Sequence, residues 1–152
     1  MNFGRQTGIG GALPVRAGLC NVRAVLKRAG LRPTRQRLAL GQLLFAAGGR
    51  HVSAESLHEE AGRANISVSL ATIYNALNQF TDAGLLREIS VDGNRSYYDT
   101  DVSDHHHFLV EDTNEVIDIP ADQLALATLP EPPEGMEIDK VEIVVRLRRK
   151  AN

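Results

Sequence analysis

Cysteine is almost absent from this chain of 152 residues, which contains Cys20 and no other. A single cysteine excludes a disulfide within the chain and any structural zinc site made of four cysteines, and it is typical of a reducing cytosol. Long apolar runs are missing too, since no segment approaches the ~18 residues of a membrane span and none near the start has the length of a signal peptide. We therefore expect a soluble, cytoplasmic protein with no membrane partner.

Acidic residues are absent from residues 1–50, which contain nine lysines and arginines, whereas the rest of the chain has eight of these against nineteen acids. The two parts therefore carry formal charges of +9 and -11. A basic part favours a polyanion such as nucleic acid, and an acidic part with clustered histidines favours cations. A solvated basic tail that binds nothing in particular is the alternative.

Helical spacing and capping residues predict four helices in the first hundred residues. They cover residues 22–29, 34–48, 53–63 and 69–84. Two alternating segments, 86–91 and 95–99, follow and are separated by Asp92-Gly93, which is a strong hairpin signal. Helices followed by a hairpin predict a winged-helix DNA-binding domain over residues 20–99, after a flexible arm at residues 1–19.

The remaining residues predict a small α/β domain at 104–152, joined by a hinge at 100–103. Strands are expected at 105–111, 115–119 and 138–147, with a short helix at 121–128. About fifty residues make a marginal core, so we expect this part to share its core with a second copy in a homodimer. The predicted fold class is α+β.

The fourth predicted helix has an unusual composition, because no charged residue occurs between Ala64 and Thr81. An inward stripe of Leu70, Ile73, Leu77 and Phe80 would leave methyl, hydroxyl and amide groups on the other face. Such groups can meet base edges in the major groove. The candidates for base contact are Ala71, Thr72, Tyr74, Asn75 and Asn78. A helix buried on both sides is the alternative.

Four arginines near the predicted DNA-binding elements are candidates for phosphate contacts, which set register without reading sequence. They are Arg32, Arg35 and Arg37 at the start of the second helix and Arg95 after the hairpin turn. Each alone would be ordinary solvated surface. Together with the acid-free start of the chain they favour DNA as the partner.

Three of the five histidines form the run His105, His106 and His107. A strand alternates its side chains, so His105 and His107 would lie on one face with Cα atoms about 6.6 Å apart and form a metal chelate. His106 would point to the opposite face with Phe108 and Val110, where it serves a second site or packs. A solvated histidine cluster is the alternative.

Several segments, in this order and spacing, resemble the ferric uptake regulator family over residues 22 to about 148. They are the segments Arg50-His51-Val52-Ser53-Ala54-Glu55-Ser56-Leu57, 69–77, 78–80 with 82–85, and the histidine run. The resemblance implies a dimeric, metal-responsive winged-helix repressor with an α/β dimerisation domain. The histidine run and the missing cysteines most resemble the iron response regulator branch of the family, whose members sense haem.

The resemblance also implies a regulatory metal site at the hinge between the two domains. Its ligands would be His51, Asp99, His105 and His107, and Asp118 matches a further carboxylate of this region. Mixed nitrogen and oxygen ligands suit iron, manganese or zinc, and the sequence does not choose among them.

Haem is the second cofactor that the resemblance implies. His105, His106 and His107 offer nitrogen atoms for axial ligation of haem iron. Cys20 is followed by Asn21 rather than by the proline of a haem motif, so we interpret it as a small apolar residue.

Three departures from the family pattern affect what is expected. Val110 and Thr113 stand where many members carry a pair of zinc-binding cysteines, so the dimer should rely on apolar packing. Asn75 stands where the family commonly has arginine, which indicates an altered operator preference. Ala125 and Val141 replace residues of the family's other metal site.

The resulting hypothesis is a homodimeric transcriptional regulator that binds double-stranded operator DNA and responds to iron or haem, controlling genes of iron and haem metabolism. A metal or haem carrier is the first alternative, and its fourth helix should tolerate charge. A zinc hydrolase is the second, but it needs a third ligand, an open position and a base, and no such set stands out. We therefore do not expect an enzyme.

Overall fold

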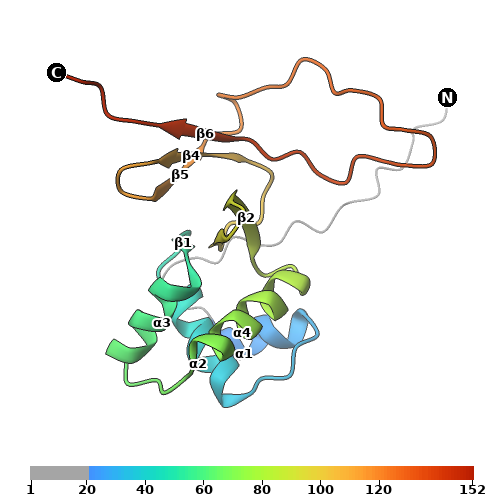
Figure 1. The fold of residues 1–152 in the computed structure, drawn as a ribbon. Coiled ribbons are helices and arrows are strands. Elements are labelled where there is room, and N and C mark those ends of the chain that lie inside the picture. The colour runs from blue at the N-terminus through green and yellow to red at the C-terminus, as the bar shows by residue number, and fades with distance from the viewer. Residues whose placement is uncertain (1–20) are drawn as a thin grey trace. The chain divides into compact units, whose positions relative to one another are not determined.

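The computed structural model describes residues 21–152, so the predicted N-terminal arm and Cys20 lie outside the described residues. Figure 1 shows the helices gathered together, and most of the strands follow them in the chain. The helices are α1 (Val22–Arg28), α2 (Arg35–Phe45), α3 (Ala54–Arg63) and α4 (Leu70–Asp82). The strands are β1 (His51–Val52), β2 (Arg87–Asp92), β3 (Arg95–Asp99), β4 (His106–Val110), β5 (Glu115–Ile119) and β6 (Val144–Leu147).

The chain divides into two compact units. The first contains the described residues up to Glu88 together with Tyr98–Val102, and the second contains Ile89–Tyr97 together with Ser103–Asn152. The outer part of the β2–β3 hairpin therefore belongs to the second unit, although its base belongs to the first. Among residues 21–152, the longest apolar helical segment falls short of what crossing a membrane requires.

Polar side chains start the helices of the first unit at the predicted places. The side chains of Thr34 and Ser69 accept hydrogen bonds from the backbone N–H of the third residue of α2 and of α4. Ser53 and Ser56 form a reciprocal capping box at the start of α3. Each cap is worth about 1 kcal/mol, because it satisfies a backbone N–H that the helix leaves without a partner. These helix starts confirm the prediction.

The core of the first unit joins all four helices in one apolar cluster. Its fully buried members are Leu26, Leu40, Leu44, Leu57, Ile73, Leu77 and Phe80. Burial of each such side chain stabilises the fold by about 1.5–3 kcal/mol. Gly41 lets α1 and α2 approach closely, because a Cβ atom at this position would lie 2.5 Å from Cγ1 of Val22.

One residue of the predicted inward stripe of α4 lies outside the core. Ile73, Leu77 and Phe80 are completely buried, whereas Leu70 is 36% exposed and Ala76 occupies the stripe instead. Leu70 is the first residue of the helix, so no preceding turn lies beside it to complete the apolar contact. The spacing of apolar residues identified the buried face of α4 but did not show that this face ends before Leu70.

The hairpin of the first hundred residues is confirmed, but its turn is at Gly93–Asn94, one residue later than predicted, because Asp92 ends β2. Strand β1 adds to the free edge of β3, so the sheet order is β1-β3-β2. The antiparallel register places His51 opposite Asp99 and Val52 opposite Tyr98. This short pairing brings together His51 and Asp99, which lie far apart in the sequence.

The second unit contains a three-stranded sheet in the order β5-β4-β6. Strands β4 and β5 are antiparallel, with His107 opposite Asp118, and β4 and β6 are parallel, with His107 opposite Val144. The buried residues of the small core are Ile89, Val91 and Leu109, with Tyr97, Val116 and Val144 packed against them. The hairpin therefore supplies two of the three buried residues of this cluster.

Two sequence predictions for the second unit are wrong. The expected helix at 121–128 is a turn, closed by a hydrogen bond from the N–H of Gln123 to the carbonyl of Pro120, and the chain then runs without regular structure to β6 (Figure 1). Leu126 and Leu129 are 46% and 50% exposed, and so short a helix is marginal without a surface to pack on. The expected strand at 138–147 is restricted to Val144–Leu147, where β4 supplies the pairing.

Candidate functional site

A histidine and a buried carboxylate face each other in the sheet of the first unit. His51 Nε2 lies 3.1 Å from Oδ2 of Asp99, and the Asp99 side chain is 1% exposed. The other oxygen of Asp99, Oδ1, accepts a hydrogen bond of 2.8 Å from the N–H of Asp101. A buried carboxylate is tolerated only when such partners replace its water. The pair thus follows from the β1–β3 register and offers one nitrogen and one oxygen ligand.

The second unit holds two histidines and one carboxylate. Nε2 of His105 and Nε2 of His107 lie 3.0 and 3.3 Å from the same oxygen of Asp118. The two rings meet edge to face with centroids 4.5 Å apart, and His105 is 7% and His107 0% exposed. The predicted placement of both histidines on one face is therefore confirmed, and the alternative of a solvated cluster is wrong.

Asp118 joins this group through strand register. It lies opposite His107 in the β4–β5 pair, and the ligand atoms of the three residues lie within 4.8 Å of one another. Reasoning from the residues alone missed this carboxylate, which only the family resemblance supplied. The signal was present in the turn at residues 112–114, because a short turn fixes which residues of the two strands face each other.

The hydrogen bonds of His105 suit a cation beside Asp118. Its Nδ1 lies 2.7 Å from the carbonyl oxygen of Ser103, which only accepts, so Nδ1 carries a proton. A neutral His105 ring then has its lone pair on Nε2, which faces the carboxylate. A cation near Nε2 of His105 and Oδ1 of Asp118 makes this arrangement favourable. A histidine that binds a metal through one nitrogen usually donates its other N–H to a carbonyl or carboxylate, as His105 does to Ser103. The three residues therefore fit a divalent metal ion.

His106 is separated from its two neighbours in the run. Its Nδ1 accepts a hydrogen bond of 3.1 Å from the N–H of Ile143, just before β6. The neutral ring therefore carries its proton on Nε2, which leaves no lone pair there for axial ligation. Of the three histidines predicted as haem ligands, the structure brings His105 and His107 together and gives His106 a bond within the sheet.

Helix α4, which has no charged residue before Asp82, presents the predicted face to solvent. Ala71, Tyr74, Asn75 and Asn78 are exposed, and Thr72 is half-buried with its hydroxyl 2.9 Å from that of Ser69. The alternative of a helix buried on both sides is wrong for these residues. Asn78 also accepts a hydrogen bond of 3.3 Å from the hydroxyl of Tyr98. Because Ala71, Tyr74 and Asn75 are exposed, this face is available for a partner.

A carboxylate from α3 holds the tip of Tyr74. The phenol donates a 2.7 Å hydrogen bond to Oε1 of Glu55. This bond is the main cause that raises the pKa of Tyr74 and lowers the pKa of Glu55. Near neutral pH the phenol is therefore protonated and the carboxylate ionised. Sequence analysis did not identify Glu55 as part of this face.

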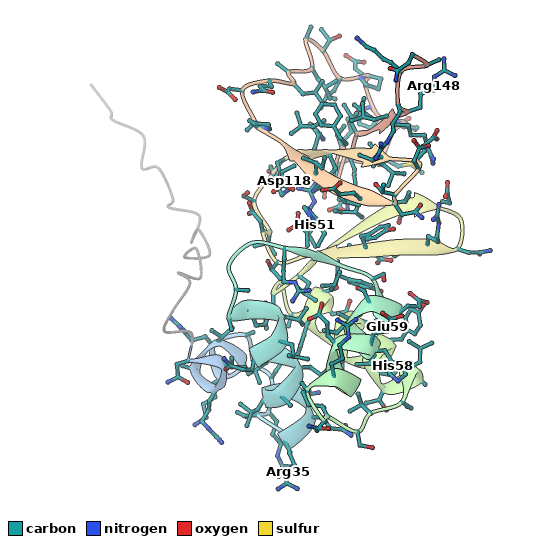
Figure 2. The ribbon with its side chains drawn as sticks, turned by 90° about the vertical axis from the view of Figure 1, so that its left-hand side faces the viewer. Arg35, His51, His58, Glu59, Asp118 and Arg148 are labelled. Carbon is teal, nitrogen blue, oxygen red and sulfur yellow. The ribbon has the colours of Figure 1, made fainter. Side chains whose placement is uncertain are left out.

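The three arginines near α2 have different surroundings. Arg32 and Arg35 are exposed, and Arg35 extends away from the helices (Figure 2). Arg37 instead donates two hydrogen bonds, of 3.2 and 2.8 Å, to Oε1 of Gln79 on α4, and a third of 2.9 Å to the carbonyl of Arg32. Arg37 thus links α2 to α4 in the described structure, and Arg32 and Arg35 have the exposure that phosphate contacts require.

Arg95, the fourth candidate, bonds to its own surroundings at the hairpin tip. Its guanidinium donates to Asp92 at 2.7 Å and to the side-chain oxygen of Asn114 at 2.6 Å. Asp92 also receives a 2.7 Å bond from Arg146 of β6. The hydrogen bond from Arg95 is the largest cause that lowers the pKa of Asp92, and the hydrogen bond from Arg146 is the next largest. This contact of Arg146 was not foreseen from the sequence.

Comparison with known proteins identifies the family. The pattern of the family described as "Ferric uptake regulator family" matches residues 28–146. The ferric uptake regulation protein of Pseudomonas fluorescens is 37% identical over 100 residues, which cover 65% of this chain and 81% of that protein. The corresponding protein of Pseudomonas aeruginosa is 39% identical over 94 residues, which cover 61% and 70%.

Solved structures agree with this assignment. The ferric uptake regulator from Pseudomonas aeruginosa with manganese has a TM-score of 0.64 and 29% identity, covering 87% of this chain and 100% of that chain. The ferric uptake regulator of Vibrio cholerae has the same fold, with a TM-score of 0.63 and 23% identity over 84% of this chain and 98% of that chain. The predicted α+β class, a winged-helix domain followed by an α/β dimerisation domain, is confirmed. The chain belongs to the ferric uptake regulator family, whose members are metal-sensing regulators of transcription and not enzymes.

Proposed function

We propose that this protein regulates genes of iron metabolism by binding operator DNA as a homodimer, under the control of a divalent metal ion. The observation that carries the proposal is the group formed by His105, His107 and Asp118. Two buried histidines share one carboxylate oxygen, and the carbonyl of Ser103 orients one of the rings. This donor set suits iron, manganese or zinc.

The group in the second unit supplies three ligand atoms, which is fewer than the four to six that these metals prefer. The pair His51 and Asp99 of the first unit supplies the same kinds of atoms, and we propose it as a further donor set for the metal.

Haem has less support than a metal ion. His106 uses its Nδ1 lone pair to accept from Ile143, and Nε2 of both His105 and His107 faces Asp118. A haem ligand needs an accessible nitrogen lone pair and an apolar space for the macrocycle. We therefore assign the histidine run to a metal ion, and membership of the iron response regulator branch stays a prediction.

Operator DNA is the proposed partner of α4. Its exposed face carries the methyl, phenol and amide groups of Ala71, Tyr74 and Asn75, none of which is charged near neutral pH. Arg32 and Arg35 lie exposed near the start of α2 for contacts with the backbone. A metal carrier has no need of such a face, which favours regulation over transport.

A second copy of the chain is the proposed partner of the second unit. Several large apolar side chains are exposed there, which is unfavourable for an isolated domain of this size. They are Ile117, Leu126, Leu129, Met136, Ile138 and Leu147.

Selection of DNA sequences from a random duplex library tests the proposal. The library is presented to the purified full chain with Mn²⁺, which resists oxidation in air, and in parallel with a chelator. We expect Mn²⁺ to change the affinity for the selected sequence by at least about tenfold, within the range of allosteric couplings. Failure to enrich a common sequence argues against regulation. Enrichment with equal affinity in both conditions argues against metal control.

A further inference from the structure

We propose that Glu55 sets operator specificity by positioning Tyr74 on the base-reading face of α4. The inference rests on the proposed binding of DNA by α4 and goes beyond it, because it assigns a role to a residue of a different helix. Glu55 lies in the first turn of α3, and Tyr74 lies in the second turn of α4.

The geometry restrains the tyrosine at both ends. Its Cβ is fixed by α4, whose buried side is anchored by Ile73 and Leu77, and its hydroxyl is fixed by the 2.7 Å bond to Glu55. A tyrosine has two side-chain torsions, so a bond at the hydroxyl selects one orientation of the ring. The ring remains 38% exposed and therefore open to a partner.

The position of Glu55 is itself well defined. The capping box of Ser53 and Ser56 fixes the first turn of α3, and Ala54 and Leu57 on either side of Glu55 are buried. A carboxylate in the first turn is also favoured by the helix dipole. The acceptor for Tyr74 is therefore held in place before DNA arrives.

The charge of Glu55 argues for a specific role. An ionised carboxylate beside a DNA-reading helix opposes the approach of phosphate groups, so it weakens binding to all sequences alike. Its hydrogen bond to Tyr74 joins two exposed side chains, and such bonds add little to folding stability. The helices α3 and α4 already pack through Leu57, Ala61 and Ile73. The hydrogen bond from Tyr74 to Glu55 therefore serves mainly to orient the tyrosine ring.

The direction of the bond determines which base edges Tyr74 can meet. Its single proton is donated to Glu55, so towards DNA the hydroxyl only accepts. Adenine and cytosine present amino donors in the major groove, and the ring itself can contact a thymine methyl. The carbonyl edge of guanine offers acceptors alone, so Tyr74 held in this way discriminates against guanine.

The test compares operator and scrambled duplexes bound to the full chain with Mn²⁺. The main variant is Glu55→Ala. The matched control is Glu59→Ala, which removes the same charge from an exposed position one turn along α3 (Figure 2). Glu59 lies 3.4 Å from Arg63. We expect both variants to bind the scrambled duplex more tightly. Only Glu55→Ala should lower the ratio of operator to scrambled affinity, by about 10-fold.

Two further variants separate positioning from a loss of structure. Glu55→Gln keeps a neutral acceptor for the phenol, so it should restore most of the operator preference. In a Tyr74→Phe background, Glu55→Ala should change both affinities equally, because no hydroxyl is left to orient. The pKa of the tyrosine, followed by ultraviolet absorption, should fall towards its ordinary value in Glu55→Ala, since the hydrogen bond raises it.

The outcomes distinguish this inference from the proposed function. An unchanged affinity ratio in Glu55→Ala, with loss of preference in Tyr74→Ala, overturns the role of Glu55 and leaves DNA reading by α4 intact. Equal binding of operator and scrambled duplexes by the unaltered protein overturns the proposed function itself. Failure of Glu55→Gln to restore any preference also contradicts positioning by the acceptor.

Discussion

Arg146 of β6 holds the tip of the β2–β3 hairpin through Asp92, with a guanidinium nitrogen 2.7 Å from the carboxylate and 2.7 Å from the carbonyl of Val91. The same carboxylate accepts from Arg95. A winged helix uses its hairpin to grip the DNA backbone. In this chain the tip charges are engaged by the sheet of the second unit, so the hairpin tip depends on residues far along the sequence.

Arg146→Ala should loosen the hairpin tip without unfolding the protein. Its bond to Asp92 is exposed and its bond to Val91 is only partly buried, so the fold depends little on them. The hairpin tip, in contrast, loses both contacts with Arg146. Hydrogen exchange at residues 89–95 should accelerate, with little change in the midpoint of urea unfolding. Arg148→Ala, just beyond β6 (Figure 2), is the matched control and should leave the exchange unchanged. Equal protection in both variants would contradict the contact.

Acid should release the same tip. The guanidinium groups of Arg95 and Arg146 lower the pKa of Asp92, so their stabilisation is complete above the unfolded pKa of about 4 and disappears as pH falls through the lower folded value. The wild-type tip should therefore loosen in acid below about pH 4. Asp92→Asn should remove that part of the pH dependence. Amide chemical shifts of residues 91–95, titrated in both proteins, provide the measurement.

Tyr74→Ala and Arg32→Ala should weaken DNA binding in different ways. We expect Tyr74→Ala to reduce affinity for the operator by about 10- to 100-fold and to spare the scrambled duplex, because its ring meets base edges. Arg32→Ala should weaken both duplexes and lower the salt slope by about one unit. Binding isotherms at several salt concentrations compare them. The same loss of specificity in both variants would contradict the separation of roles.

The histidine run should respond to substitution according to the strand face. His107→Ala removes a proposed ligand, so we expect loss of Mn²⁺ and Zn²⁺ binding at this site, whereas His106→Ala should retain most of it. Loss of the His106 ring breaks only the bond from Ile143. Isothermal titration of each metal gives the affinities. His106→Ala binding as poorly as His107→Ala would place the ion elsewhere.

Removal of metal should leave the proposed dimer intact. Because residues 21–152 contain no cysteine to hold a zinc ion, we expect the second unit to associate through apolar side chains. Sedimentation velocity before and after a strong chelator should give the same mass. Dissociation into monomers would show that an ion holds the interface.

Local chemistry allowed the first unit to be predicted well. Thr34, Ser53 and Ser69 cap helices because their side chains bond to backbone groups only three residues away, and such short-range effects are visible in sequence. Leu70 was misplaced because periodicity says nothing of how far the neighbouring surface extends. The helix expected at 121–128 failed because its formation depends on a packing surface that sequence does not reveal.

The site was predicted in part for the same reason. The shared face of His105 and His107 follows from alternation within one strand. The bond between Tyr74 and Glu55 spans 19 residues, and the contact of Arg146 with Asp92 spans 54. Such pairs arise from helix packing and strand order, so no local sequence pattern indicates them.

The parallel pairing of β6 with β4 has a consequence for folding order. Strand β6 can pair only after the irregular connection at residues 120–143 has closed, and the entropy of closing a loop must be overcome before its contacts form. The hairpin β2–β3 and the antiparallel pair β4–β5 need only short turns. Arg146 therefore reaches Asp92 late, and the tip of the hairpin is among the last parts of the chain to become fixed.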